Sequence, residues 1–181
     1  MDAQEQQTLQ RAQRMETKAL VEIFDQHSPG LYRYALRRTG FPQMAEDCVS
    51  ETFARFLQTL QRPDKHIKTS IRAYLYRTAH NWLIDQHRKD PTISEELDET
   101  LTPDRQPTPE QQVNHHDQAE QMRSAMRQLP PAQQQVISLR YLEEWSLKEC
   151  AEAMGKTVGA IKTLQNRAMK NLQKILVPQE Q

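Results

Sequence analysis

Residues 156–174 carry the side chains of this sequence that are best suited to bind a polyanion. The segment has five basic residues and no acidic residue, although the whole chain has a formal net charge of zero. Lysine suits phosphates and guanine edges, and side-chain amides suit adenine edges, so this mixture favours DNA recognition. We expect groove and backbone contacts from five residues and phosphate contacts from two more: Thr157, Lys162, Thr163, Gln165 and Asn166, then Arg167 and Lys170.

The residues in and before this segment predict two helices joined by a tight turn. Residues 146–149 match a capping box, in which Ser146 and Glu149 each satisfy a backbone amide at a helix start. Gly155 ends that short helix in the left-handed conformation that glycine adopts readily, and Thr157 caps the next helix. Residues 146–175 are thus predicted to be a helix-turn-helix, the alternative being an amphipathic hairpin with a solvated basic face. The apolar stripe of the second helix is Ile161, Leu164, Ala168, Leu172 and Ile175.

An acidic linker that contains prolines separates this unit from the rest of the chain. Residues 91–120 hold eight acidic side chains against one basic side chain. Residues 90–113 include four prolines and few apolar side chains, so we expect no packed core there. Fully extended, these residues would span roughly 80 Å. The chain is therefore predicted to form two small helical domains, 18–89 and 114–177, that can reach separate sites.

The N-terminal half shows helical spacing and no strand-like alternation, so the predicted fold class is all-α. Residues 1–17 form a polar extension in which we expect frayed helix or disorder. A helix from about residue 15 to 27 is expected to stop before Ser28 and Pro29, which match the start of another helix. Further helices are predicted to end at Gly40, to begin at Pro42, and to run over 70–88. The expected inward-facing side chains are Ala19, Leu20, Ile23 and Phe24, then Leu31, Tyr34, Ala35 and Leu36, then Ala45, Val49, Phe53, Phe56 and Leu60, and finally Ile71, Leu75, Thr78, Trp82 and Asp85.

The composition argues against several functional classes. No run approaches the roughly 20 apolar residues that span a bilayer, and the polar N-terminus lacks a secretory signal, so we expect a cytoplasmic protein without membrane insertion. Cys48 and Cys150 are expected to be buried reduced thiols rather than a disulfide. Residues 115–117 (His-His-Asp) are interpreted as a solvated helix start rather than a metal site. No phosphate-binding loop or nucleophile motif is visible, so we expect neither enzymatic activity nor a cofactor.

Segments of both halves resemble conserved patterns of bacterial sigma factors. Residues 45–57 (AEDCVSETFARFL) are similar to region 2.2, and residues 73–88 (AYLYRTAHNWLIDQHR) are similar to regions 2.3 and 2.4. Residues 159–162 (GAIK), among others in the helix-turn-helix, resemble region 4 of the extracytoplasmic-function (ECF) group. The resemblance covers about residues 18–89 and 118–176. Regions 1.1 and 3 have no counterpart, as in that group.

The resemblance implies a division of labour between the two halves. In this family, region 2 binds the β′ clamp helices of core RNA polymerase and opens the −10 promoter element, while region 4 binds the β flap and reads the −35 element. For this chain it implies a polymerase-binding surface at Asp47, Glu51 and Arg55, for which an ordinary solvated face is the alternative. An anti-sigma factor is left open as a further partner.

Contacts with the −10 element are expected from the fourth helix and the loop before it. Basic side chains there would hold phosphates, and polar or aromatic side chains would trap an unstacked base. For Trp82, a place in the hydrophobic core is the stronger alternative. The candidates are Lys65, His66, Lys68, Asn81, Trp82, Arg88 and Lys89.

Four positions depart from the family pattern. Ser50 stands where the family usually has glutamine, Tyr74 where it has tryptophan, and His80 and Gln135 where it has arginine. We expect the last two departures to affect promoter preference or domain packing. The rival interpretations are a stand-alone helix-turn-helix regulator and an enzyme with a DNA-binding tail. Residues 18–89 resemble neither a sensory nor a dimerising domain and no catalytic site is visible, so the sigma factor interpretation is favoured.

Overall fold

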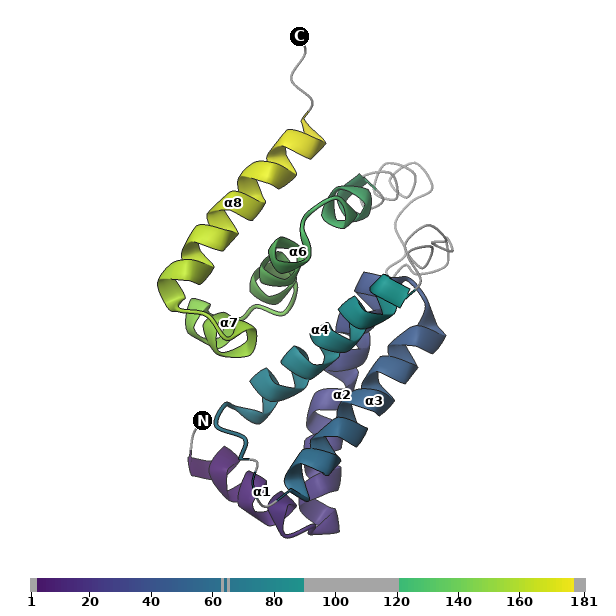
Figure 1. Cartoon of the computed structure of the whole chain (residues 1–181), viewed down its shortest axis with the longest axis vertical. Helices are drawn as coiled ribbons and strands as arrows, with labels where there is room; N and C mark the ends of the chain where they lie inside the picture. The colour runs from purple at the N-terminus through teal and green to yellow at the C-terminus, as the bar shows by residue number, and fades with distance from the viewer. Residues whose placement is uncertain (1–2, 63, 65, 90–120, 178–181) are drawn as a thin grey trace, which may run out of the picture.

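The fold is helical throughout the residues that the structure, a computed structural model, describes: 3–62, 64, 66–89 and 121–177 (Figure 1). No strand is present in these ranges, which confirms the all-α prediction. The predicted linker and the His-His-Asp run lie outside them. None of the described helices is long and apolar enough to cross a membrane. The helices are α1 (Ala3–Gln13), α2 (Thr17–Thr39), α3 (Pro42–Leu60), α4 (Ile71–Lys89), a helical segment over 121–127, α6 (Pro131–Ile137), a π-helical turn (Ser138–Leu142), α7 (Leu147–Met154) and α8 (Val158–Leu176).

Helices α2, α3 and α4 pack together around one apolar core (Figure 1). Leu31 and Tyr34 of α2, Phe56 of α3 and Leu75 of α4 are almost fully buried. Proline opens α3 at its first position, where a missing backbone amide costs nothing because that amide has no helical acceptor. All five apolar residues predicted to face inward from α3 are buried: Ala45, Val49, Phe53, Phe56 and Leu60.

One helix runs through Pro29, where the sequence predicts a break between two helices. α2 contains Pro29 in its interior and ends, as predicted, at Gly40, whose φ of 77° is left-handed. An interior proline removes a helical hydrogen bond and costs about 3 kcal/mol. The apolar side chains on either side of it, Ile23 and Leu31, are buried in the bundle core, and their burial outweighs this cost. The predicted break is therefore wrong, because tertiary packing overrides the local signal.

The polar N-terminal residues form an ordered helix rather than frayed helix or disorder. Leu9 and Ala12 of α1 are buried against α2. Glu5 Oε1 accepts a 2.7 Å hydrogen bond from the backbone amide of Ile71, the first residue of α4. The prediction for residues 1–17 is thus wrong over α1. Two apolar side chains one turn apart are too few to predict an amphipathic helix from the sequence. Once α2 covers them, their burial stabilises α1.

Helices α6, α7 and α8 form a second group, whose buried side chains continue the same hydrophobic core. Val136, Leu139 and Ile161 are almost fully buried. The predicted stripe of α8 is confirmed, since Ala168 and Leu172 are also buried and the remaining two residues are half-buried. α6 continues without a break into the following turn, Ser138–Leu142, which is widened into the π-helical form.

Both cysteines are free and buried, as predicted. Burial raises the pKa of the Cys48 thiol to about 12 and that of the Cys150 thiol to about 11. Because the thiolate is the reactive form, these thiols are poor nucleophiles at neutral pH.

His80 occupies the core of the first bundle. Its Nδ1 lies 3.2 Å from the hydroxyl of Tyr34, which is also buried. Burial, together with the positive charge of Arg38, lowers the pKa of His80 to about 3. The imidazole is therefore neutral in the folded protein at physiological pH. At this departure from the family pattern, the structure thus shows a role in packing.

Lowering the pH from 7 to 5 should destabilise the protein through His80. The folded-state pKa of about 3 is below the ordinary value of 6.5, so between these values the unfolded chain binds a proton that the folded chain does not. His80 alone should then cost about 2 kcal/mol at pH 5. Urea unfolding at the two pH values should show that acidification lowers the free energy of unfolding less in His80→Gln than in the unaltered chain. His66→Gln, at an exposed position, is the control. Equal pH dependence of the His80→Gln variant and the unaltered chain would contradict this.

Candidate nucleic-acid and partner interfaces

Helix α8 presents a basic, amide-bearing face to solvent. Thr157 caps its start, where Oγ1 accepts a 3.2 Å hydrogen bond from the backbone amide of Ala160. An exposed helix face of this kind can enter the major groove and place donors against base edges and phosphates. The predicted contact residues that are exposed are Thr157, Lys162, Thr163, Asn166, Arg167 and Lys170.

The turn before α8 has the geometry that the sequence predicts. Ser146 Oγ accepts a hydrogen bond from the amide of Glu149, and Glu149 Oε2 accepts one from the amide of Ser146, so the capping box is complete. These bonds from Ser146 hold the pKa of Glu149 below its usual range. Gly155 ends α7 with a φ of 63°, a left-handed conformation that side chains disfavour. The capping box and the left-handed glycine therefore determine how α8 follows α7.

Gln165 differs from its neighbours, because its side chain is already engaged. Its amide donates a 2.8 Å hydrogen bond to the hydroxyl of Tyr141, and the residue is half-buried. Tyr141 itself is 49% exposed and thus belongs to the same surface. Sequence reasoning missed Tyr141, because no spacing rule links residues that lie 24 positions apart.

The residues predicted to contact the −10 element are only partly brought together. Asn81, Arg88 and Lys89 are exposed on the C-terminal half of α4. His66 and Lys68 are exposed in the loop before the N-terminus of the same helix. Because α4 is 19 residues long, about 28 Å at the usual helical rise, the two sets lie toward opposite ends of it. Lys65 lies outside the described residues.

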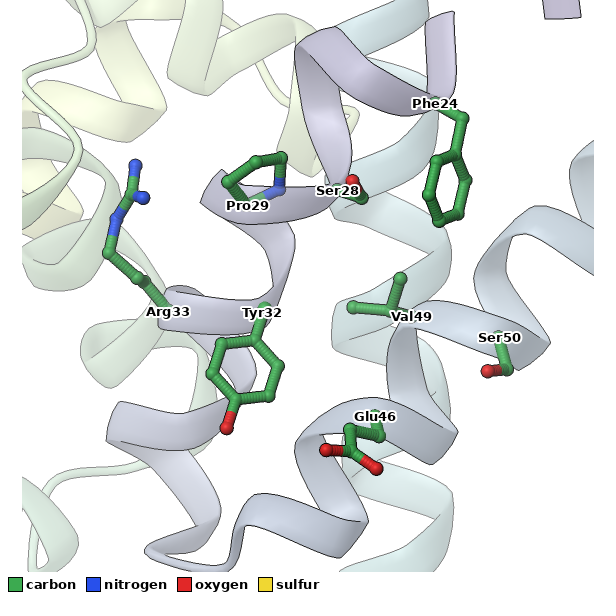
Figure 2. Close-up of a pocket in the computed structure, with 8 residues that line it drawn as sticks. All are labelled: Phe24, Ser28, Pro29, Tyr32, Arg33, Glu46, Val49 and Ser50. Carbon is green, nitrogen blue, oxygen red and sulfur yellow. The ribbon is translucent and has the colours of Figure 1, made fainter. Parts of the chain in front are cut away.

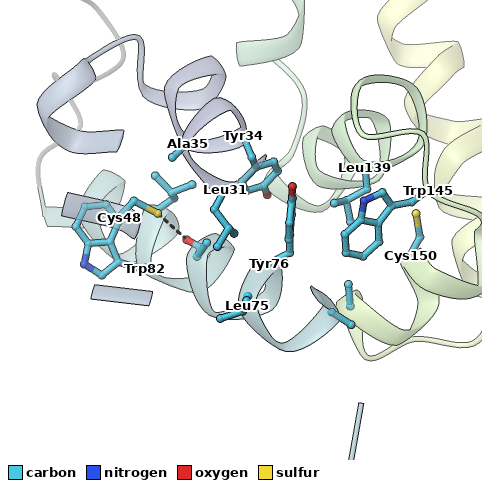
Figure 3. Close-up of a cluster of buried hydrophobic side chains, with 14 of the residues drawn as sticks. Leu31, Tyr34, Ala35, Cys48, Leu75, Tyr76, Trp82, Leu139, Trp145 and Cys150 are labelled. Carbon is cyan, nitrogen blue, oxygen red and sulfur yellow. Dashed lines mark hydrogen bonds between the residues drawn. The ribbon is translucent and has the colours of Figure 1, made fainter. Parts of the chain in front are cut away.

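Trp82 is buried, as its place on the predicted inward stripe of α4 indicates, but Asp85 is not. Trp82 is only 8% exposed and belongs to the hydrophobic core, so its ring is not free to stack on a base (Figure 3). Asp85 is exposed rather than part of the inward stripe. For Asp85, helical periodicity gave the approximate face of α4, but only the packing of α2 and α3 against that helix decides which residues are covered.

The predicted polymerase-binding residues lie on the outer side of α3. Asp47 is exposed and accepts a 3.4 Å hydrogen bond from Gln43. Glu51 and Arg55, one turn apart, form an ion pair of 2.7 Å that is half exposed. Such a surface pair contributes little to stability, so both groups are available to a partner.

An open pocket of about 510 Å³ adjoins this surface between α2 and α3 (Figure 2). Phe24 is 46% exposed at its rim and packs against Phe53, with ring centroids 4.8 Å apart. The sequence pattern assigned Phe24 to the core, which is wrong, and it gave no sign of the pocket. The lining residues are Phe24, Ser28, Pro29, Tyr32, Arg33, Glu46, Val49 and Ser50.

Two family profiles match the chain, one over each group of helices. The profile described as Sigma-70 region 2 matches residues 23–91, and the profile described as Sigma-70, region 4 matches residues 125–174.

Named relatives of known class are similar to the chain over most of its length. It is 36% identical over 178 residues to the ECF RNA polymerase sigma factor BldN of Streptomyces coelicolor, an alignment that covers 93% of this chain and 64% of BldN. It is 30% identical to the RNA polymerase sigma factor YlaC of Bacillus subtilis, over 86% of this chain and 91% of YlaC. It is 32% identical to the ECF RNA polymerase sigma factor SigL of Mycobacterium tuberculosis, over 83% of this chain and 84% of SigL.

Two solved structures share the fold. CnrH, in complex with the cytosolic domain of CnrY, has a TM-score of 0.67 and 19% identity, covering 97% of this chain and 99% of CnrH. The sigma factor RpoE of Bartonella quintana, in complex with the anti-sigma factor NepR, has a TM-score of 0.58 and 20% identity, covering 91% and 98%. At these identities the likeness concerns the arrangement of helices.

Removal of the cap in Ser146→Ala should lower the free energy of unfolding by about 1 kcal/mol, because the backbone amide of Glu149 loses its hydrogen-bond acceptor at the start of α7. Urea unfolding followed by circular dichroism measures this. Ser50→Ala, in the middle of α3, is the matched control and should not destabilise, since alanine has the higher helix propensity. Unchanged stability of Ser146→Ala would contradict the role of the capping box.

Proposed function

The chain belongs to the ECF group of the sigma-70 family, and from this membership we propose that it joins core RNA polymerase and directs initiation at promoters with matching −10 and −35 elements. The observation that carries the proposal is the pairing of two helical groups, each matched by its own sigma-70 region, with an exposed basic recognition helix in the second. Its activity is thus that of an initiation factor, without catalysis of its own.

We assign recognition of the −35 element to the helix-turn-helix. Lys162 and Asn166 are exposed one turn apart on α8, so both can reach one face of the major groove. Arg167 and Lys170 are also exposed and are assigned to phosphates. Gln165 reaches DNA in this proposal only after it releases Tyr141.

We assign contact with the −10 element to His66 and Lys68 of the loop and to Asn81, Arg88 and Lys89 of α4. The exposure of all five side chains supports the assignment. The basic groups among them would hold phosphates of the promoter, whose affinity is dominated by such contacts.

We assign the contact with core polymerase to the outer side of α3. Asp47 and Glu51 supply negative charge there, and the pocket next to them supplies apolar surface at Phe24 and Val49 (Figure 2). An apolar pocket beside charged side chains is the usual composition of a protein-binding site. The β′ clamp helices would bind at this surface, and the β flap would bind the C-terminal half.

The stand-alone regulator is the weaker alternative, because residues 23–91 match region 2 rather than a sensory domain. A protein that serves core polymerase works in the cytoplasm, which is the location we propose. Since RpoE of Bartonella quintana is solved with the anti-sigma factor NepR, we also propose an anti-sigma factor as a partner of this chain.

Promoter-specific initiation should appear on genomic templates when purified core polymerase is supplied with this protein, and not without it. Lys162→Ala combined with Asn166→Ala should then weaken the footprint over the −35 element by about tenfold or more, since each base contact contributes about 1–3 kcal/mol. Binding to core polymerase should be unchanged.

The matched control removes the same two kinds of side chain at the other end of α8, as Lys174→Ala with Gln173→Ala; both residues are exposed. Absence of any promoter-specific transcript would overturn the proposed function. A normal footprint of the Lys162 and Asn166 variant would overturn only the assignment of the recognition face.

Charge reversal on α3 should reduce binding to core polymerase. Asp47→Lys with Glu51→Lys replaces negative by positive charge on the surface assigned to the clamp helices, and co-purification with core should fall at least severalfold. Asp85→Lys, at an exposed position of α4, is the control. Circular dichroism establishes that the variants fold, and assembly at the normal level would show that this surface does not bind the clamp.

A further inference from the structure

Three of the four glycines of the chain are required by its own fold. Gly40 and Gly155 have left-handed φ values of 77° and 63°, which residues with a side chain rarely adopt. A Cβ on Gly30 would lie 2.8 Å from the hydroxyl of Tyr76. The fourth glycine, Gly159, has an ordinary helical backbone, and a Cβ there would meet no atom of the described residues within 4 Å. Nothing in the described part of the fold therefore requires glycine at this position.

Glycine at position 159 weakens the helix that contains it. Residue 159 is the second residue of α8, and glycine stabilises a helix less than alanine because it loses more backbone freedom on folding. The next residue is Ala160, which is exposed, so the same turn of α8 accommodates alanine. A glycine that costs stability and relieves no contact inside the fold points to a contact outside it. Close approach of another molecule to the backbone is the contact that glycine permits best.

Gly159 lies on the face of α8 that is predicted to contact DNA. Lys162, Thr163 and Asn166 follow it by three, four and seven residues, the spacing of one helix face, and all three are exposed. The major groove is about 12 Å wide and a helix with its side chains is about 10–12 Å across, so the groove leaves little free space around α8. The missing side chain lets the backbone at Gly159 come closer to base edges than at the other positions of this face.

The polar groups beside Gly159 are already paired within the helix. Thr163 Oγ1 donates a 3.1 Å hydrogen bond to the carbonyl oxygen of Gly159. The Thr163 hydroxyl has no second hydrogen, so it can accept a hydrogen bond from DNA but not donate one. Phosphate oxygens are acceptors and gain nothing from such a surface. The thymine methyl group is the apolar group that base edges present in the major groove, and the absent Cβ leaves room for a group of that size.

We propose that a thymine methyl group of the −35 element packs directly on the backbone of Gly159, which makes residue 159 a specificity-determining position of α8. This inference rests on the proposed function. A Cβ at position 159 would compete with the thymine methyl group for one space, and it would leave the free protein undisturbed. Substitution by alanine should therefore have opposite effects on stability and on promoter binding.

Gly159→Ala tests both effects. The melting temperature of the free full-length chain should rise by about 1–3 °C, because alanine has the higher helix propensity. Core polymerase loaded with the variant should bind a promoter duplex about tenfold more weakly than core polymerase loaded with the unaltered chain, a loss typical of one disturbed base pair. The duplex is one in which the unaltered chain protects the −35 element. Ala160→Ser adds one atom at an exposed position about 100° around α8 and is the control, with binding expected within about twofold.

Deoxyuridine in the promoter duplex identifies the group that Gly159 contacts, because it differs from thymidine only by the missing methyl group. Each thymine of the −35 element is replaced in turn, on either strand. One of these duplexes should bind the Gly159→Ala protein within about threefold of the affinity of the unaltered pair, since the alanine methyl group then occupies the vacated space. The same duplex should bind the unaltered protein more weakly than the thymine duplex does.

The inference is wrong if Gly159→Ala binds the thymine duplex as tightly as the unaltered chain does. It is also wrong if no deoxyuridine position restores binding of the variant. Promoter-specific transcription by the unaltered chain in either case leaves the proposed function standing. Absence of that transcription overturns the proposed function and this inference with it.

Discussion

Tyr76 lies where the part of the hydrophobic core under α2, α3 and α4 meets the part under α6, α7 and α8 (Figure 3). Its ring centroid is 5.2 Å from that of Tyr34 in the first bundle and 4.9 Å from that of Trp145 in the second group. A Cβ on Gly30 would lie 2.8 Å from the Tyr76 hydroxyl, so α2 needs glycine where the ring passes. The position of Tyr76 in turn fixes the side of α4 on which Arg72 and its neighbours meet the other half. A single buried ring therefore couples the register of α2 and α4 to the contact between the halves.

What the sequence could predict was local. The capping box at Ser146, the left-handed Gly155 and the stripe of α8 each follow from residues within one or two turns of one another, and all three predictions are confirmed. The continuity of α2 through Pro29 and the order of α1 depend instead on surfaces supplied by distant segments. A proline in the sequence indicates the cost of a lost helical hydrogen bond, but not the burial of apolar side chains that offsets this cost. The predicted break at Pro29 is wrong for this reason.

The contacts between the two helical groups could not be predicted from the sequence for the same reason. Arg77 donates a hydrogen bond to the carbonyl of Ala153, 76 positions away, and in the sequence Arg77 is one more polar residue on an amphipathic helix. The two tryptophans show the same limit. The core position that the sequence pattern favoured for Trp82 is confirmed, whereas no pattern predicted the deeper burial of Trp145. Residue type alone does not separate core from interface when two helical groups share a boundary.

The neutral net charge of the chain conceals a separation of charge between its two helical groups. The recognition helix α8 is basic and the outer side of α3 carries Asp47 and Glu51, and both surfaces remain exposed while α4 and α7 are in contact. The basic surface suits a polyanion, whose phosphates it can neutralise. The acidic surface lies beside an apolar pocket and therefore suits a protein partner.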